Sequence, residues 1–144
     1  MSLQIYEKVF PGVIEEILTE GSFFSQGKRA GNLSIYWDTG SQMTCISKRL
    51  AEKLNLEYSG MKVPVTSINK DDQFGDVVVG NLSLGNNDIN IHGARFCVLD
   101  ADKLGADILI GIDIIALGTF HLKYSRESNA TLFHFEFDPS IMVR

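Results

Sequence analysis

The stretch best suited to chemistry is the acidic turn Asp38-Thr39-Gly40-Ser41, which follows the apolar segment Ile35-Tyr36-Trp37. Such a segment predicts a strand that delivers Asp38 to its end. Gly40 permits a sharp reversal, because a residue without a Cβ adopts backbone angles that others avoid, and the flanking hydroxyls can hydrogen-bond back into the turn. A carboxylate between apolar segments is costly to bury without a partner. Asp38 is therefore a candidate general acid or base, with a capping role as the alternative.

A second apolar segment also ends at a glycine and an acid. Residues Ile108 to Ile112 are nearly all apolar, which is typical of a strand buried on both faces. Gly111 would let two backbones approach closely. Asp113 then opens a short helix toward Leu117, which Gly118 would end. We therefore interpret Asp113 as a helix N-cap rather than as a second catalytic acid.

The other ionisable and thiol side chains do not have the spacing of a catalytic or metal site. A metal site needs three or four converging ligands, so we expect structural roles for the scattered His92, His121 and His134. We expect solvated side chains for the aspartates of polar segments, which are Asp71, Asp72, Asp100, Asp102 and Asp107. Cys45 and Cys97 form no Cys-x-x-Cys pair and are expected to be reduced, partly buried thiols. No metal or organic cofactor is expected.

The two segments together carry a family resemblance. Asp38-Thr39-Gly40-Ser41 resembles the catalytic motif of aspartic proteases, and Ile108 to Gly111 resembles the apolar-apolar-Gly element of the same fold. The chain has one Asp-Thr-Gly, which favours the retropepsin-like group, in which one small chain supplies half an active site. The resemblance covers Phe23 to Phe137. It implies an all-β, mainly antiparallel, closed-barrel-like acid protease fold with one or two short helices, assembled as a homodimer.

The resemblance also implies an activity, that of an aspartic endopeptidase. Asp38 from each of two subunits would share one water across a twofold axis, one carboxylate acting as general base and the other as general acid. Thr39 would hydrogen-bond across to the partner's loop, and Gly40 would offer its carbonyl to the peptide backbone. Ser41 stands where this group has a small residue. The expected partners are therefore a second copy of the chain and a polypeptide substrate.

A long hairpin from Gly60 to Gly85 matches the place of the flap, the hairpin that closes over peptide in retropepsins. The substrate contacts expected by resemblance are Gln42 and Ile112 beside the catalytic turn, and Ile68 and Asn69 in the flap. The tip from residue 69 to 73 is charged rather than Gly-rich, and an ordinary solvated hairpin stays open as an alternative. Together with Gln42, where retroviral enzymes often have an acid, this tip motivates a second hypothesis, a catalytically inactive retropepsin-fold module for dimerisation or peptide binding.

Composition limits the other function classes. The 144 residues predict one domain with its own core. A net charge of -5 and a pI near 5.1 argue against nucleic acid as a main partner, because phosphate binding needs a basic face. No apolar run approaches the ~20 residues of a membrane span. The beginning of the chain lacks the basic-then-apolar pattern of a signal peptide, so a cytoplasmic location is expected.

Residues 1–21 are the least family-like part and are predicted to form a leader or arm ahead of a protease domain at 22–144. Leu3 to Phe10 alternates as a strand would, and Val13 to Leu18 has helical spacing. The sequence leaves open whether this leader is a pro-segment, an arm across the dimer or part of the core.

Three further elements would support the site. The polar stretch from Gln26 to Asn32 predicts a hairpin that feeds the strand to Asp38. Ser47 is a good N-cap for a helix whose apolar face is Leu50, Ala51 and Leu54. Thr131 to Phe137 alternates as a half-buried terminal strand, which would either pair with another chain at its edge or close this chain's own sheet.

Overall fold

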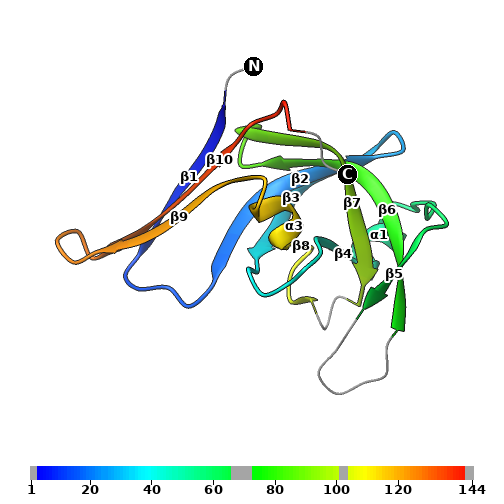
Figure 1. The fold of residues 1–144 in the computed structure, drawn as a ribbon, viewed down its shortest axis with the longest axis horizontal. Helices are drawn as coiled ribbons and strands as arrows, with labels where there is room; N and C mark the ends of the chain where they lie inside the picture. Colours follow the sequence, from blue (N-terminus) through cyan, green and yellow to red (C-terminus); the bar gives the residue numbers. More distant parts are fainter. Residues whose placement is uncertain (1–2, 66–72, 101–103, 142–144) are drawn as a thin grey trace.

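The computed structural model describes residues 3–65, 73–100 and 104–141. Strands make up most of this part of the chain (Figure 1). The elements are β1 (Gln4–Pro11), β2 (Ile17–Ser25), β3 (Lys28–Trp37), β4 (Cys45–Ser47), α1 (Lys48–Lys53), β5 (Lys62–Val65), β6 (Gln73–Leu84), β7 (Ile89–Leu99), β8 (Ile108–Ile110), α3 (Ile112–Ile115), β9 (Gly118–Ser125) and β10 (Ala130–Phe137).

The larger sheet closes into a barrel. Its strand order is β2-β3-β8-β4-β7-β6-β5, and β2 also pairs with β6 from Gly21 to Phe24, so six strands form a ring. Closure removes free strand edges around the ring. The pairs are antiparallel except for β3 with β8 and β4 with β7. The predicted all-β, barrel-like fold with one or two short helices is therefore confirmed for the described residues.

The barrel core is apolar and tightly packed. Phe23 on β2 meets Phe96 on β7 edge-to-face, with ring centroids 5.1 Å apart. All three residues of β8 are buried, as the uninterrupted apolar run predicted. Strand β3 pairs with β8 from Ile35 to Trp37, which places the residue after Trp37 at the end of a buried strand. This arrangement gives the acidic turn a rigid base.

A second sheet, in the order β1-β10-β9, projects from the barrel (Figure 1). Phe133, Phe135 and Phe137 of β10 are buried, which confirms the alternation seen in the sequence. Strand β10 lies between β1 and β9, with both edges paired along its length. The alternative in which this strand closes the chain's own sheet is therefore the one observed, and β10 has no free edge for another chain.

The beginning of the chain belongs to this fold. Strand β1 pairs with β10 along its whole length, and Tyr6 is buried. The predicted helix from Val13 to Leu18 is wrong, because β2 begins at Ile17, which is buried and pairs with Trp37. Less than two turns of helix is marginal on its own, whereas a strand gains a full ladder of hydrogen bonds. The boundary placed at 21/22 falls inside β2.

Two local predictions near β3 also need correction. The hairpin between β2 and β3 turns at Gln26 and Gly27 alone, with φ angles of 54° and 74°, because two residues with positive φ match the twist of the strands. The stretch from residue 28 to 32 is already strand. Asp107 is half-buried rather than solvated, since its Oδ2 accepts from the Ser34 backbone N–H at 2.9 Å and the Ser34 hydroxyl at 3.2 Å.

Helix α1 follows its predicted pattern. The Ser47 hydroxyl accepts from the Leu50 N–H at 3.1 Å, so Ser47 is the N-cap. Leu50 and Ala51 are buried against the barrel. No helix in the described ranges is long and apolar enough to cross a membrane.

The long hairpin is present as β5 and β6, which pair from Lys62–Asp76 to Val65–Gln73. Residues 66 to 72, which include the predicted contacts Ile68 and Asn69, lie outside the described residues.

Candidate active site

Asp38 stands directly after β3 and is held by backbone hydrogen bonds. Its N–H donates to the Ile110 carbonyl of β8 at 2.9 Å, and its carbonyl accepts from the Ser41 N–H at 3.1 Å. Its Oδ1 accepts from the Gly40 N–H at 2.9 Å. The side chain is half-buried, while Thr39 and Gly40 are exposed. The turn therefore presents a carboxylate of fixed orientation at the surface of the barrel.

The loop from residue 38 to 44 crosses the end of β8, because β8 lies between β3 and β4 in the sheet. A Cβ on Gly111 would lie 2.6 Å from the Met43 carbonyl carbon and 2.9 Å from the Ser41 oxygen. Real Cβ atoms do not approach so closely, so glycine is required for the loop to rest on the strand end. The close backbone approach predicted at Gly111 is confirmed.

The residues after β8 bind the same loop. The Ile112 N–H donates to the Ser41 carbonyl at 2.7 Å, and the Gly111 N–H donates to Thr44 Oγ1 at 3.1 Å. The Asp113 carboxylate accepts from the Thr44 N–H at 3.1 Å and from the Thr44 hydroxyl at 2.7 Å. Segments 38–44 and 110–113 thus form one hydrogen-bonded unit.

The interpretation of Asp113 as an N-cap is wrong. The N-cap of α3 is Gly111, whose carbonyl accepts from the Ile114 N–H at 3.2 Å and the Ile115 N–H at 3.1 Å. Asp113 is the second residue of the helix, where its carboxylate accepts from the Thr44 hydroxyl and from the adjacent Ile114 N–H at 3.0 Å. The helix begins earlier than predicted because the extended Gly111 can place its carbonyl over the first turn.

The residues expected beside Asp38 do lie together, with two exceptions. Ser41 is half-buried and its hydroxyl donates to the Met43 carbonyl at 2.9 Å. Gln42 is exposed on the same loop. Ile112 is 41% exposed and is tied to Ser41 through its amide. The exceptions are the two hairpin-tip residues named above, whose positions are not described.

Two thiols lie directly behind the loop. Cys45 on β4 and Cys97 on β7 are opposite each other in register, and both are buried and free. A hydrogen bond with Cys97 and burial raise the pKa of the Cys45 thiol, and the charges of Asp113 and Asp38 act in the same direction. This thiol is therefore neutral near pH 7 and is a poor nucleophile. Both thiols are unpaired, as expected, and they are more completely buried than the partly buried side chains that the sequence predicted.

Sequence reasoning missed Thr44. It is completely buried, and its hydroxyl connects Gly111 to Asp113. Its partner Asp113 is 69 residues away in the chain, so local spacing contains no signal for the contact. A threonine between two apolar residues is equally compatible with an ordinary strand.

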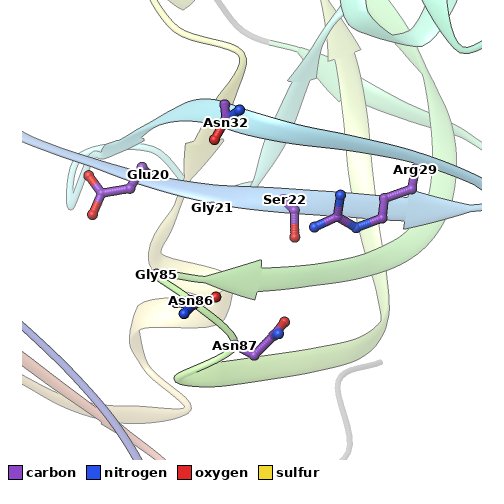
Figure 2. Close-up of a pocket in the computed structure, with 8 residues that line it drawn as sticks. All are labelled: Glu20, Gly21, Ser22, Arg29, Asn32, Gly85, Asn86 and Asn87. Carbon is purple, nitrogen blue, oxygen red and sulfur yellow. The ribbon is translucent and has the colours of Figure 1, made fainter.

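A polar pocket of about 340 Å³ lies elsewhere on the barrel wall (Figure 2). It is lined by Glu20, Gly21, Ser22, Arg29, Asn32, Gly85, Asn86 and Asn87. These residues come from β2, β3 and the turn after β6, and none belongs to the loop that carries Asp38. Over the described residues, no group of three or more His, Cys, Asp or Glu side chains is arranged to hold a metal ion.

The comparisons with known proteins agree with this geometry. Residues 30–116 match the family described as "gag-polyprotein putative aspartyl protease". A search of curated proteins gave no match. Among solved structures, the chain is similar to the crystal structure of a retropepsin-like aspartic protease from Rickettsia conorii, at 14% identity and a TM-score of 0.57, over 96% of this chain and 98% of that chain.

At 14% identity the structural likeness concerns the fold, whereas the family match concerns the sequence. The matched range contains both the Asp38 turn and the segment from Ile108 to Asp113 that holds it. The chain therefore belongs to the gag-polyprotein aspartyl protease family and has the retropepsin-like aspartic protease fold.

Proposed function

We propose that this protein is an endopeptidase in which two copies of the chain each contribute Asp38 to one catalytic centre. The observation that carries the proposal is the half-buried Asp38 carboxylate, oriented by the Gly40 N–H on a turn fixed to β8. Within the described part of the chain, the hydrogen bond to this carboxylate comes from its own turn, so the side chain does not serve to join separate segments. Family membership makes peptide-bond hydrolysis the chemistry to expect of it.

A second copy is needed because hydrolysis by this route uses two carboxylates. Asp113, the nearest candidate within segment 110–113, is bound to Thr44 instead. A twofold axis beside the turn would place two Asp38 side chains opposite each other without any further residue. The exposed Thr39 on each copy is available to hydrogen-bond across that axis.

The two carboxylates would hold one proton between them, since two like charges so close do not both ionise. The ionised Asp38 takes a proton from the shared water as the water oxygen bonds to the scissile carbonyl carbon. The protonated Asp38 gives its proton to the carbonyl oxygen, which yields a neutral gem-diol. In the second step the C–N bond breaks, the amine nitrogen takes a proton from one carboxyl group, and a diol hydroxyl returns a proton to the other.

The neighbouring residues would bind the polypeptide. The exposed Gln42 and Ile112 flank the turn and would contact substrate side chains. The Gly40 carbonyl would accept from the peptide backbone. The hairpin β5–β6 would act as the flap, with Ile68 and Asn69 at its tip.

The test is the variant Asp38→Asn, assayed on an unstructured peptide at mildly acidic pH. We expect cleavage by the unaltered chain, inhibition by pepstatin, and at least about a 100-fold loss of rate in the variant, since a general acid–base group contributes about 10²–10⁴-fold. Sedimentation should show both proteins as dimers. Asp88→Asn, a carboxylate in an exposed turn far along the chain, is the control and should leave cleavage intact.

Cleavage that survives Asp38→Asn would refute the proposal. Peptide binding without any turnover would instead favour the inactive dimerisation or peptide-binding module.

A further inference from the structure

We propose that Asp113 and Thr44 are positioning residues, which clamp the turn that carries Asp38 to the end of β8. The proposal rests on the catalytic role of Asp38 proposed above and adds two residues that do not themselves touch substrate. Figure 1 shows the cyan loop after β3 lying beside β8 and α3.

Thr44 is the centre of the clamp. It is completely buried, and each of its polar groups has a partner. Its carbonyl accepts from the Cys97 N–H of β7 at 3.0 Å. Its hydroxyl accepts from the Gly111 N–H and donates to Asp113 Oδ1. A buried residue bonded to three separate segments can adopt one orientation only.

Asp113 supplies the charged half of the clamp. Its carboxylate accepts both the N–H and the hydroxyl proton of Thr44, at 3.1 Å and 2.7 Å. Hydrogen bonds to an ionised acceptor are about twice as strong as neutral ones. The Asp113 side chain is nevertheless exposed, in the first turn of a four-residue helix. Its Oδ1 also accepts from the neighbouring Ile114 N–H at 3.0 Å, so a substitution there removes this local bond together with the two bonds to Thr44, without opening the core.

The clamp acts on Asp38 because the loop is bonded to segment 110–113 at three successive points. These are the Asp38 N–H on Ile110, the Ser41 carbonyl on Ile112, and Thr44 on Gly111 and Asp113. The first two bonds keep the loop near β8, and the third ties its last residue to the segment that follows β8, in addition to the Cys97 bond and the pairing of β4 with β7 and β8. When the third is lost, the turn is held to segment 110–113 by the first two bonds alone, and a misplacement of about 1 Å can cost about 100-fold in rate.

The experiment compares Thr44→Val, Thr44→Ser, Asp113→Ala and the double variant Asp113→Ala/Thr44→Val. Val keeps the volume of Thr and removes the hydroxyl, whereas Ser keeps the hydroxyl. Asp138→Asn is a control for loss of a carboxylate charge elsewhere, at a residue that also accepts the N–H and the hydroxyl of one residue, Ser140, at 2.9 Å and 2.7 Å. Steady-state kinetics on the unstructured peptide, normalised to the folded fraction from circular dichroism, give kcat and KM separately.

We expect Asp113→Ala and Thr44→Val to lower kcat about 10-fold or more while KM changes less than about threefold, because the misplaced group acts in the chemical step. Thr44→Ser should restore kcat to within about threefold. The kcat of the double variant should lie within about threefold of the kcat of either single variant. The reason is that the effects of two residues in one hydrogen-bonded unit do not add. Asp138→Asn should match the unaltered chain.

A normalised kcat within twofold of the unaltered chain in Asp113→Ala, or full additivity in the double variant, would overturn the clamp. Amide hydrogen exchange of peptides that cover residues 38–46 gives a second readout that needs no activity. We expect exchange there to rise about 10-fold in Asp113→Ala and not in Asp138→Asn, since lost tertiary bonds lower the local opening free energy. Unchanged exchange in Asp113→Ala would also refute the clamp. If the unaltered chain cleaves no peptide but its exchange still depends on Asp113, only the proposed function is refuted.

Discussion

The indole of Trp37 packs against the ring of Phe133, with centroids 4.8 Å apart, so the projecting sheet contacts the residue that precedes Asp38. Trp37 also lies 5.1 Å from Phe135, and its Nε1–H donates to the buried Thr19 hydroxyl at 3.0 Å. Strand β3, which leads into the acidic turn, therefore contacts both β2 of the barrel and the β1-β10-β9 sheet through Trp37. The stability of the projecting sheet and the geometry of the turn are physically linked at this contact.

Truncation of Phe133 tests this link. Phe133→Ala leaves a cavity beside Trp37, and we expect a loss of about 3–5 kcal/mol in the free energy of unfolding. Urea denaturation followed by Trp37 fluorescence measures it directly, since this is the chain's one tryptophan. Leu132→Ala, next in the chain and 40% exposed, is the control and should cost less than about 1 kcal/mol. Equal effects in the two variants would show that the aromatic contact does not support the sheet.

Gly111 is expected to tolerate no side chain. In Gly111→Ala the new Cβ would overlap the Met43 backbone, which cannot move without displacing the loop. We expect a loss of about 2 kcal/mol or more and faster amide exchange in residues 38–44, because overpacking forces backbone shifts. Gly31→Ala is the control, since there the nearest atom is the flexible end of the Arg29 side chain at 3.2 Å. Similar melting temperatures for both variants would contradict the close approach.

His134, on the outer face of the projecting sheet, should make the free energy of unfolding depend on pH. His134 Nδ1 lies 2.5 Å from Glu7 on β1, its Nε2 lies 3.2 Å from Glu136, and its ring meets that of His121 at 5.5 Å. The hydrogen bond with Glu7 raises the pKa of His134. A raised folded-state pKa means that the stabilisation is fully present below the ordinary value of 6.5 and is lost as pH rises through the folded-state value.

His134→Gln should therefore lower the free energy of unfolding at pH 5 more than at pH 9. The difference should be under about 1 kcal/mol, because the ion pairs are partly exposed. Urea titrations at the two pH values measure it, with His92→Gln, an exposed histidine on the barrel, as the control. A larger loss at pH 9 would reverse the assigned sign.

The thiols behind the loop should be unreactive in the folded protein. Because Cys45 and Cys97 are buried and the pKa of Cys45 is raised, we expect reaction with Ellman's reagent at pH 7 to be slower than in 6 M guanidinium by about 100-fold or more, given that the thiolate is the nucleophile. Under denaturing conditions both thiols should react. Rapid labelling of the native protein would show that the sheet opens easily between β4 and β7.

Features that depend on residues close together in the chain could be predicted from the sequence, whereas features that depend on residues far apart in the chain could not. The strand before Asp38 and the Ser47 cap depend on neighbours in the chain, and both are confirmed. The close approach at Gly111 was predicted from the residue type, but its partners Ser41 and Met43 lie far away in the chain. The helix at Val13 to Leu18 was wrong because Ile17 pairs with Trp37, a partner that local periodicity does not show. The N-cap at Asp113 was wrong for the same reason, since Thr44 attracts its carboxylate.

The sequence by itself determined that an acid follows a buried strand on a glycine turn, because apolar runs, glycine and capping residues act over a few positions. Only the tertiary structure decided that β8 lies between β3 and β4, so that segment 110–113 binds the loop of Asp38. It also decided that β10 pairs on both sides within its own chain. These contacts join residues far apart in sequence. Which strands pair depends on how the whole barrel closes and not on the local propensity of any one segment.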